Sequence, residues 1–205
     1  MKIKKVEPGF SASNTYIIYD EKSCEGVMID PGEMGELLVC EAAAINIKFI
    51  IITHAHFDHI GALEYVADKT GAQVVIHELE SPALTDMNYN LSTLAGVPAN
   101  KRKADITVKD GDTLKVGDIK FEFIHTPGHT VGGMCIFVGE DDLVTGDTLF
   151  CGSVGRTDFP GGNHRTLMES IGRLARFDDN IKIYPGHGEE STIGFEKMTN
   201  PYMNL

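Results

Sequence analysis

The sequence predicts an α/β protein, and three observations support this prediction. Short runs rich in β-branched and aromatic residues alternate with segments whose apolar residues recur at helical spacing. Turn-forming residues follow most of the apolar runs. The length of 205 residues, with 42% hydrophobic and 23% charged residues, suits one globular domain that spans residues 1–205.

The first half of the chain indicates a β-α-β-α-β order. Two neighbouring strands are expected at Thr15–Tyr19 and Val27–Asp30, because both runs are rich in β-branched and aromatic residues. Apolar residues at spacings of three, one and four predict a helix over 33–46. The following residues predict a strand, a helix closed by a glycine and another strand, at 48–52, 60–69 and 73–76. The stretch 84–103 is compatible with a loop or a lid.

The second half repeats the alternation. Strands are expected at 119–125, 133–138, 142–145 and 181–184, with a helix over 164–177. Polar motifs consistently follow the ends of the apolar runs. Ligands bind at the ends of strands in open α/β sheets, so these motifs indicate one binding site.

Charge and composition exclude several classes of partner. The chain has 30 acidic against 18 basic residues and a net charge of −12, which disfavours binding to a nucleic-acid backbone. The longest apolar run, Phe49–Ile52, is far too short to span a membrane, and Met1–Phe10 lacks the apolar core of a secretory signal. Four scattered cysteines without a C-x-x-C pair fit a reduced compartment. We therefore expect a cytoplasmic protein with a small-molecule substrate, and its oligomeric state is left open.

The densest chemical motif follows the apolar run 50–52. Three imidazoles and one carboxylate lie within six residues, namely His54, His56, Asp58 and His59. An H-x-H pair at the end of a strand can turn both rings toward one ion, and the next Asp-His pair can reach a second position. The motif therefore predicts a metal site with two neighbouring positions.

Three later motifs supply the same ligand types at the ends of predicted strands. They are His125-Thr-Pro-Gly-His129, Thr145-Gly-Asp147 and Tyr184-Pro-Gly-His187. Each candidate ligand follows a glycine, which allows the tight backbone turn needed beside a crowded site. Together with the first motif they complete a candidate set for two metal ions.

These motifs resemble those of a known family. The segments THAHFDHIGAL, HTPGHTVGG, TGDTLFCGSVGR and YPGHG are similar to the metallo-β-lactamase superfamily, and within it to the glyoxalase II branch, the hydroxyacylglutathione hydrolases. The resemblance runs from about Thr15 to the end of the chain. The short length, the segment GRTDFPGG and the ending GFEKMTNPYM are most similar to the compact bacterial subgroup that lacks the full helical C-terminal domain.

The resemblance implies a four-layer αββα sandwich with the metals at one edge of its two sheets. It implies that His54, His56 and His129 hold one metal, that Asp58, His59 and His187 hold the other, and that Asp147 bridges them. Two divalent ions are implied, zinc first, with iron or manganese as alternatives. A hydroxide shared by the metals would attack a thioester such as S-D-lactoylglutathione, and Asp58 would orient the water or accept its proton.

Arg156 is the candidate for substrate binding. The loop of full-length glyoxalase II carries a Lys and, two residues on, a Tyr that bind the glutathione moiety, and this sequence has Arg156 and Asp158 there. The cationic contact can persist, but the Tyr contact cannot, so the use of glutathione stays open. The alternative is that Arg156 forms a structural ion pair with Asp158 or a neighbouring Glu.

Several other polar residues have plainer interpretations. His125 is expected to make a hydrogen bond beside the site, and His77 and His164 are expected to be structural or exposed to solvent. Asp30 fits a turn or a position behind the metal ligands. Cys151 is expected to be a small buried side chain. Asp58 and Asp147 can also be interpreted as turn or capping residues.

Two rival functions fit the same motifs. The first is an iron-dependent persulfide dioxygenase, which would hold one iron through His54 or His56, together with His129 and Asp147. The second is a non-catalytic metal-binding protein. Nuclease and β-lactamase activities are less well supported, because the chain is acidic and shows no export signal.

Overall fold

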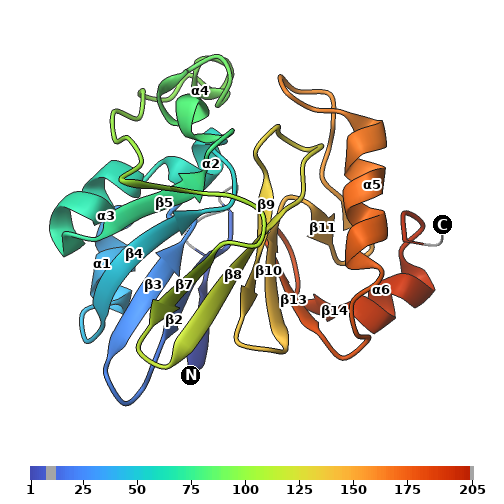
Figure 1. Ribbon diagram of the computed structural model, residues 1–205. Helices are drawn as coiled ribbons and strands as arrows, with labels where there is room; N and C mark the ends of the chain where they lie inside the picture. Colours follow the sequence, from blue (N-terminus) through green and yellow to red (C-terminus); the bar gives the residue numbers. More distant parts are fainter. Residues whose placement is uncertain (8–12, 204–205) are drawn as a thin grey trace.

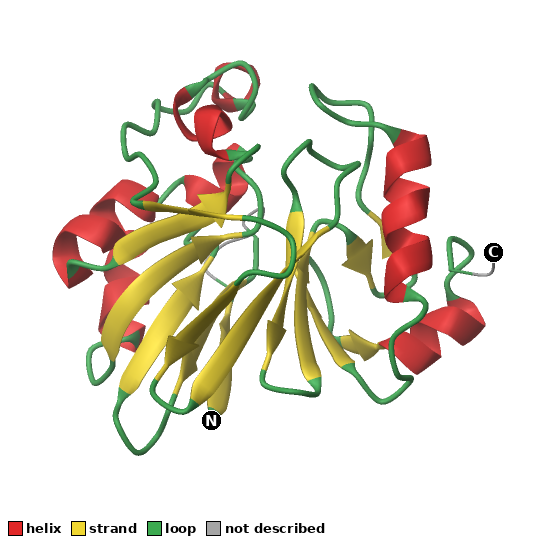
Figure 2. Cartoon of the chain, viewed as in Figure 1, coloured by secondary structure: helices red, strands yellow, loops and turns green. Residues whose placement is uncertain are grey.

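Two six-stranded sheets pack against each other, and helices cover their outer faces (Figures 1 and 2). The structure is a computed structural model that describes residues 1–7 and 13–203. The layers confirm the predicted αββα sandwich. No secretory signal is predicted in Met1–Phe10, and residues 8–10 of that stretch lie outside the described residues. Within the described ranges, no helix is both long and apolar enough to cross a membrane.

The first sheet has its strands in chain order. They are β1 (Lys2–Val6), β2 (Thr15–Tyr19), β3 (Glu25–Ile29), β4 (Asn46–Ile52), β5 (Gln73–His77) and β6 (Ile106–Val108). The strands from β3 to β6 run parallel, as the β-α-β-α-β order predicts. The connections between them hold α1 (Gly35–Glu41), α2 (Phe57–Ile60) and α3 (Leu63–Thr70).

The second sheet has the order β14-β13-β10-β9-β8-β7. These strands are β7 (Thr113–Val116), β8 (Ile119–His125), β9 (Met134–Val138), β10 (Asp142–Gly146), β13 (Lys182–Pro185) and β14 (Ser191–Thr192). The hairpin of β11 (Leu149–Phe150) and β12 (Ser153–Val154) stands apart, and α5 (His164–Leu174) and α6 (Ile193–Thr199) lie on the outer side (Figure 1).

Three apolar cores hold the layers together. The central core joins the facing sides of the two sheets and contains Ile51, Phe121 and Phe123. One outer core packs α1 and α3 on the first sheet, and the other packs α5 and α6 on the second. Burial on both faces explains why the central strands read as nearly continuous apolar runs.

The structure corrects several predicted boundaries. The helix expected over 33–46 spans only Gly35–Glu41, because the next residues form tight turns (Ile45 N donates to the carbonyl of Ala42, 2.8 Å) before β4 begins. The helix expected over 60–69 is divided at Gly61 into α2 and α3. The stretch 84–103, expected as a loop or a lid, begins within the 3₁₀ helix η1 (Ser81–Thr85). It also contains one short α-helix, α4 (Ser92–Ala95).

Candidate metal centre

The seven predicted ligands come together at one edge of the two sheets. His54, His56, Asp58 and His59 follow β4 of the first sheet. The second sheet contributes the others after three of its strands: His129 after β8, Asp147 after β10 and His187 after β13. A backbone hydrogen bond from Met134 N to the carbonyl of Thr53 joins the sheets at this edge (3.1 Å).

The first group consists of three buried histidines. Nε2 of His54 and Nδ1 of His56 are 3.1 Å apart, and Nε2 of His129 is 3.2 Å and 3.0 Å from these two atoms. Burial is the main reason why the pKa of His54 lies well below its usual value and that of His56 falls to about 3. Neutral imidazoles offer lone pairs, and ligands about 2.0–2.1 Å from a tetrahedral zinc would stand about 3.3 Å apart. The three nitrogens therefore match one metal position.

The second group adds a carboxylate. Oδ2 of Asp58 lies 3.2 Å from Nε2 of His187 and 3.9 Å from Nε2 of His59. Burial raises the pKa of Asp58, but the charge of His59 and the hydrogen bond from His187 outweigh it, so the pKa lies below its usual value. Asp58 is therefore ionised and can serve as a ligand or as a proton acceptor.

Asp147 stands between the two groups. Its Oδ2 lies 3.6 Å from Nε2 of His129 and 3.6 Å from Nε2 of His187, and its Oδ1 lies 3.3 Å from Nε2 of His59. Nε2 of His59 and Oδ1 of Asp147 are both buried, and neither has a hydrogen-bond partner among the residues that the structure describes. A cation between them would satisfy both atoms, so these residues fit a pair of divalent metal ions.

Asp30 lies behind the metal centre. Its carboxylate accepts hydrogen bonds from the backbone and hydroxyl of Thr53 (2.8 and 2.6 Å), and it lies 2.9 Å from Nδ1 of His59. This contact leaves Nε2 of His59 facing the other ligands. Of the two interpretations of Asp30, the structure favours a position behind the candidate ligand His59. Metal-binding histidines usually make such a hydrogen bond to a carboxylate through the ring nitrogen that does not face the metal.

Glu80 supports the centre and was missed in the sequence. Its side chain is fully buried, with Oε1 accepting from Ala55 N (3.1 Å) and Oε2 accepting from Gly132 N (2.8 Å). Ala55 lies between two histidines of the first group, and Gly132 follows His129 by three residues. Burial raises the pKa of Glu80, although both N–H donors oppose this effect. Glu80 follows a predicted strand without any motif, so no sequence signal identified it.

The other histidines lie outside the ligand groups. Nε2 of His125 lies 2.9 Å from the carbonyl of Val131, and its ring stacks on that of His77 with centroids 4.1 Å apart. His164 is exposed at the start of α5. Cys151 corrects a prediction, because it is exposed in the turn between β11 and β12 and not buried.

A cleft of about 550 Å³ opens over the ligands. Apolar side chains form most of its remaining wall: Phe57, Leu91, Leu94, Phe150, Val154 and Phe159. Arg156 also lines the cleft, but its guanidinium donates to both carboxylate oxygens of Asp158 (2.7 and 2.6 Å) and lies 3.9 Å from the centroid of the Phe159 ring. Arg156 therefore forms the ion pair with Asp158 that the sequence offered as the alternative to substrate binding.

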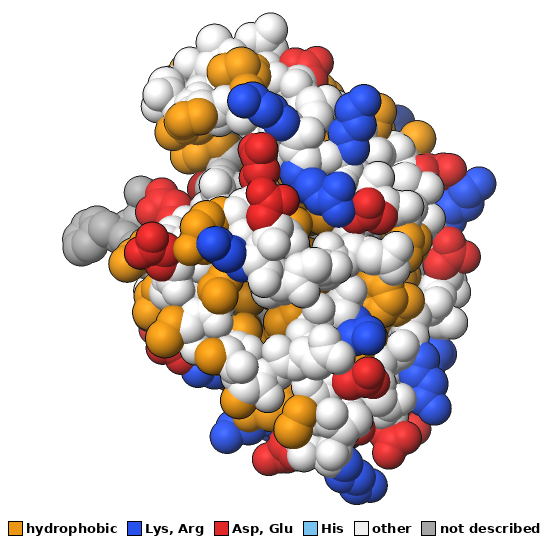
Figure 3. Space-filling model, turned by 90° about the vertical axis from the view of Figure 1, so that its left-hand side faces the viewer, with side chains coloured by type: hydrophobic (Ala, Val, Ile, Leu, Met, Phe, Trp, Pro, Cys, Tyr) orange, Lys and Arg blue, Asp and Glu red, His pale blue; other side chains and the backbone are white. Residues whose placement is uncertain are grey.

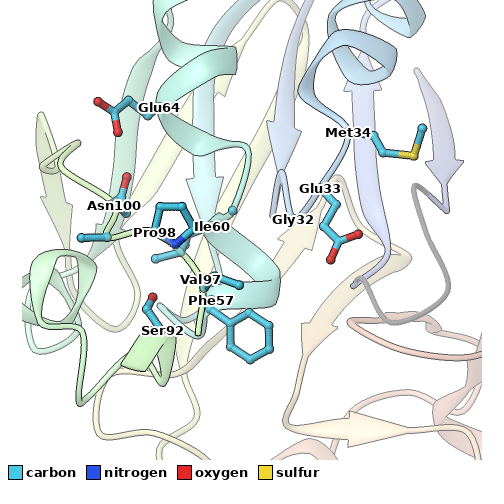
Figure 4. Close-up of a pocket in the computed structure, with 12 residues that line it drawn as sticks. Gly32, Glu33, Met34, Phe57, Ile60, Glu64, Ser92, Val97, Pro98 and Asn100 are labelled. Carbon is cyan, nitrogen blue, oxygen red and sulfur yellow. The ribbon is translucent and has the colours of Figure 1, made fainter. Parts of the chain in front are cut away.

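Phe57 also borders a second pocket of about 420 Å³. Figure 4 shows Phe57 close to Ser92, Val97 and Pro98, with Glu33 on the other side. Ile60 and Asn100 complete the side on which Phe57 lies. The two cavities are thus neighbours that share one aromatic wall.

The sandwich and its two facing ligand groups define a metal-binding protein whose centre lies between two sheets. Comparison with known families agrees with this class, because the model of the metallo-beta-lactamase superfamily matches residues 8–187. The chain belongs to the metallo-beta-lactamase superfamily.

Particular relatives cover nearly the whole chain. Hydroxyacylglutathione hydrolase GloC of Haemophilus influenzae is 34% identical over 201 residues, which are 93% of this chain and 92% of GloC. The crystal structure of the B3 metallo-beta-lactamase BLEG-1 is 34% identical, with a TM-score of 0.94 and full coverage of both chains. That of TTHA1623 in a di-iron-bound form is 31% identical, has a TM-score of 0.86 and covers 97% of this chain and 99% of that one.

Proposed function

We propose that this chain is a binuclear metal-dependent hydrolase that cleaves thioesters, as in the glyoxalase II branch. The observation that carries the proposal is the position of Asp147 between two ligand groups, each of which matches one metal position. The similarity to GloC over nearly the whole chain supports the choice of a thioester. The first ion would lie among His54, His56 and His129, the second among Asp58, His59 and His187, with Asp147 shared.

Two divalent ions in these positions would lower the pKa of water and polarise the carbonyl of the substrate. Asp58 faces the cleft as a carboxylate and accepts the proton of the attacking water. The water oxygen bonds to the acyl carbon, and the C–S bond breaks with its electron pair going to sulfur. A thiol with a pKa near about 8.5 leaves readily as thiolate, so no dedicated general acid is required.

The test combines metal analysis with two activity assays on one sample. We expect two divalent ions per chain, release of free thiol from a thioester panel, and loss of that release on chelation with recovery on adding metal. A fully loaded protein that cleaves no thioester in the panel would contradict the proposal. One iron per chain with oxygen uptake on a persulfide would instead support the dioxygenase alternative.

A further inference from the structure

We infer that the substrate of this site is a thioester with an uncharged, apolar arm, where the arm is the acyl or thiol part outside the reacting C(=O)–S group. A thioester of a carboxylate-bearing thiol such as glutathione is not the preferred substrate. This inference rests on the proposed thioester hydrolysis. It follows from the wall of the cleft, the state of its one arginine and the composition of the neighbouring pocket, which are three separate features of the chain.

The first feature is the apolar wall beyond the metal ligands. Phe57, Phe150 and Phe159 line the cleft together with four aliphatic residues, Leu91, Leu94, Ala95 and Val154. Leu94 on α4 lines the cleft and is 73% exposed, so a substrate in the cleft can contact it. Figure 3 shows further hydrophobic side chains on the outer face of the upper lobe, where α4 lies. An apolar arm of a substrate would cover the apolar side chains that line the cleft.

The second feature is the state of Arg156. Among the described residues that line the cleft, Arg156 is the only Lys or Arg. Asp158 binds the Nε–Nη2 edge of its guanidinium, and the ring of Phe159 lies against one face. The carboxylate of Asp158 offsets the charge of Arg156, so the pair offers little net attraction for an anion. The pair instead presents a flat, neutralised surface beside Phe159.

The third feature is the pocket on the other side of Phe57. Its described lining residues include the carboxylates of Glu33 and Glu64 and no Lys or Arg (Figure 4). An anionic arm that extended past Phe57 would therefore meet two like charges. Since the described lining of neither cavity offers a free Lys or Arg, the carboxylates of a glutathione arm would find no cation beyond the metal centre and the Arg156–Asp158 pair.

An apolar arm can belong to either side of the thioester bond, and two substrate series distinguish these sources. In one series the acyl group is acetyl and the thiol is glutathione or benzyl mercaptan. In the other the thiol is N-acetylcysteamine and the acyl group is lactoyl or hexanoyl. We expect kcat/KM of the metal-loaded enzyme to rise by about tenfold or more for the apolar member of one series, as burial of a few methylene groups implies.

Two variants test the wall directly. Asp158→Asn frees Arg156 and should raise kcat/KM for the glutathione thioester by about three- to fivefold, the value of one exposed charge pair. Leu94→Gln should lower kcat/KM for the preferred apolar substrate by about tenfold. Met198→Gln is the matched control, because Met198 is 74% exposed on α6 and does not line the cleft, and it should leave kcat/KM unchanged.

The outcomes separate this inference from the proposed function. Cleavage of thioesters with a preference for glutathione, and no response to Asp158→Asn or Leu94→Gln, would overturn the inference while leaving thioester hydrolysis intact. Cleavage of no thioester in either series by the loaded enzyme would contradict the proposed function itself, and the inference with it.

Discussion

Glu80 illustrates how one buried carboxylate can position two ligand-bearing loops. It accepts one hydrogen bond from the loop of His54 and His56 and another from the loop of His129. These loops follow β4 and β8, which belong to different sheets. The carboxylate therefore fixes the separation of the histidines in the first ligand group, although it is not itself a ligand.

Glu80→Ala should weaken metal binding by the first group. Both N–H donors would lose their acceptor, and replacing residues behind a metal site commonly lowers affinity by about 10- to 100-fold. Glu80→Gln should have a smaller effect, because its amide keeps one acceptor oxygen. Zinc affinity measured by competition with a chelator checks the order wild type, Gln, Ala, and circular dichroism checks that each variant folds.

Glu78→Ala is the control for this series. Glu78 lies two residues away, is exposed and contacts only the exposed Lys109 among the charged groups of the described chain (3.3 Å). The zinc affinity of the Glu78→Ala variant should equal that of the wild type. Equal affinity of Glu80→Ala and Glu78→Ala would show that the two hydrogen bonds do not control the metal centre.

The sequence was informative about single residues wherever a ligand lies in a dense motif. His54, His56, Asp58 and His59 could be selected because four residues of metal-ligating types closely follow one strand. Glu80 could not, because its role depends on Gly132, which is distant in sequence and close only in the folded chain. The exposure of Cys151 has the same origin, since a hairpin that stands apart from both sheets carries it.

At the scale of elements, hydrophobic patterning located the interior strands and missed those at the sheet edges. The predicted strands, β2 to β5, β8 to β10 and β13, all lie inside their sheets. β1, β6, β7 and β14 were missed because they form sheet edges, where only part of the strand is buried and the apolar pattern is weak. Boundaries failed where tight turns ended a helix, as after Glu41.

The ends of β5 and β8 carry a stacked pair of histidines with a predicted effect on pH stability. Burial of His77 and the charge of the stacked His125 lower the pKa of His77 to about 4. The negative charges of Glu78, Asp110 and Asp112 oppose this shift. The unfolded chain binds this proton with a pKa near about 6.5. Between these values the unfolded state binds more protons, so stability falls as pH falls.

His77→Phe tests this effect, because the ring can still stack but cannot titrate. Measured on metal-free protein, the wild type should lose about 2 kcal/mol of unfolding free energy more than the variant between pH 7 and pH 5. Urea unfolding at several pH values provides the measurement. Parallel losses in the two proteins would contradict the low pKa of His77.

At the scale of the whole molecule, a bound metal pair would connect two sheets that otherwise meet mainly through the central core. Four candidate ligands come from the first sheet and three from the second. The fold class was predictable because its alternation is local in the sequence, whereas the meeting of the two sheets at one edge was implied only by the family resemblance. Metal binding at this edge should therefore stabilise the packing of both sheets.

Removal of the metals should lower the stability of the entire chain and loosen this edge first. A ligand that binds only the folded state stabilises it by about 2.7 kcal/mol at a concentration of 100 Kd, so chelation should lower the midpoint of thermal unfolding and added metal should restore it. The amide of Met134, which donates to Thr53 across the two sheets, should exchange its hydrogen faster in the metal-free protein. In contrast, amides inside the first sheet, such as that of Ile50 on β4, should change far less. An unchanged unfolding midpoint and unchanged exchange at Met134, in protein shown to have lost its metals, would mean that the core alone holds the two sheets together.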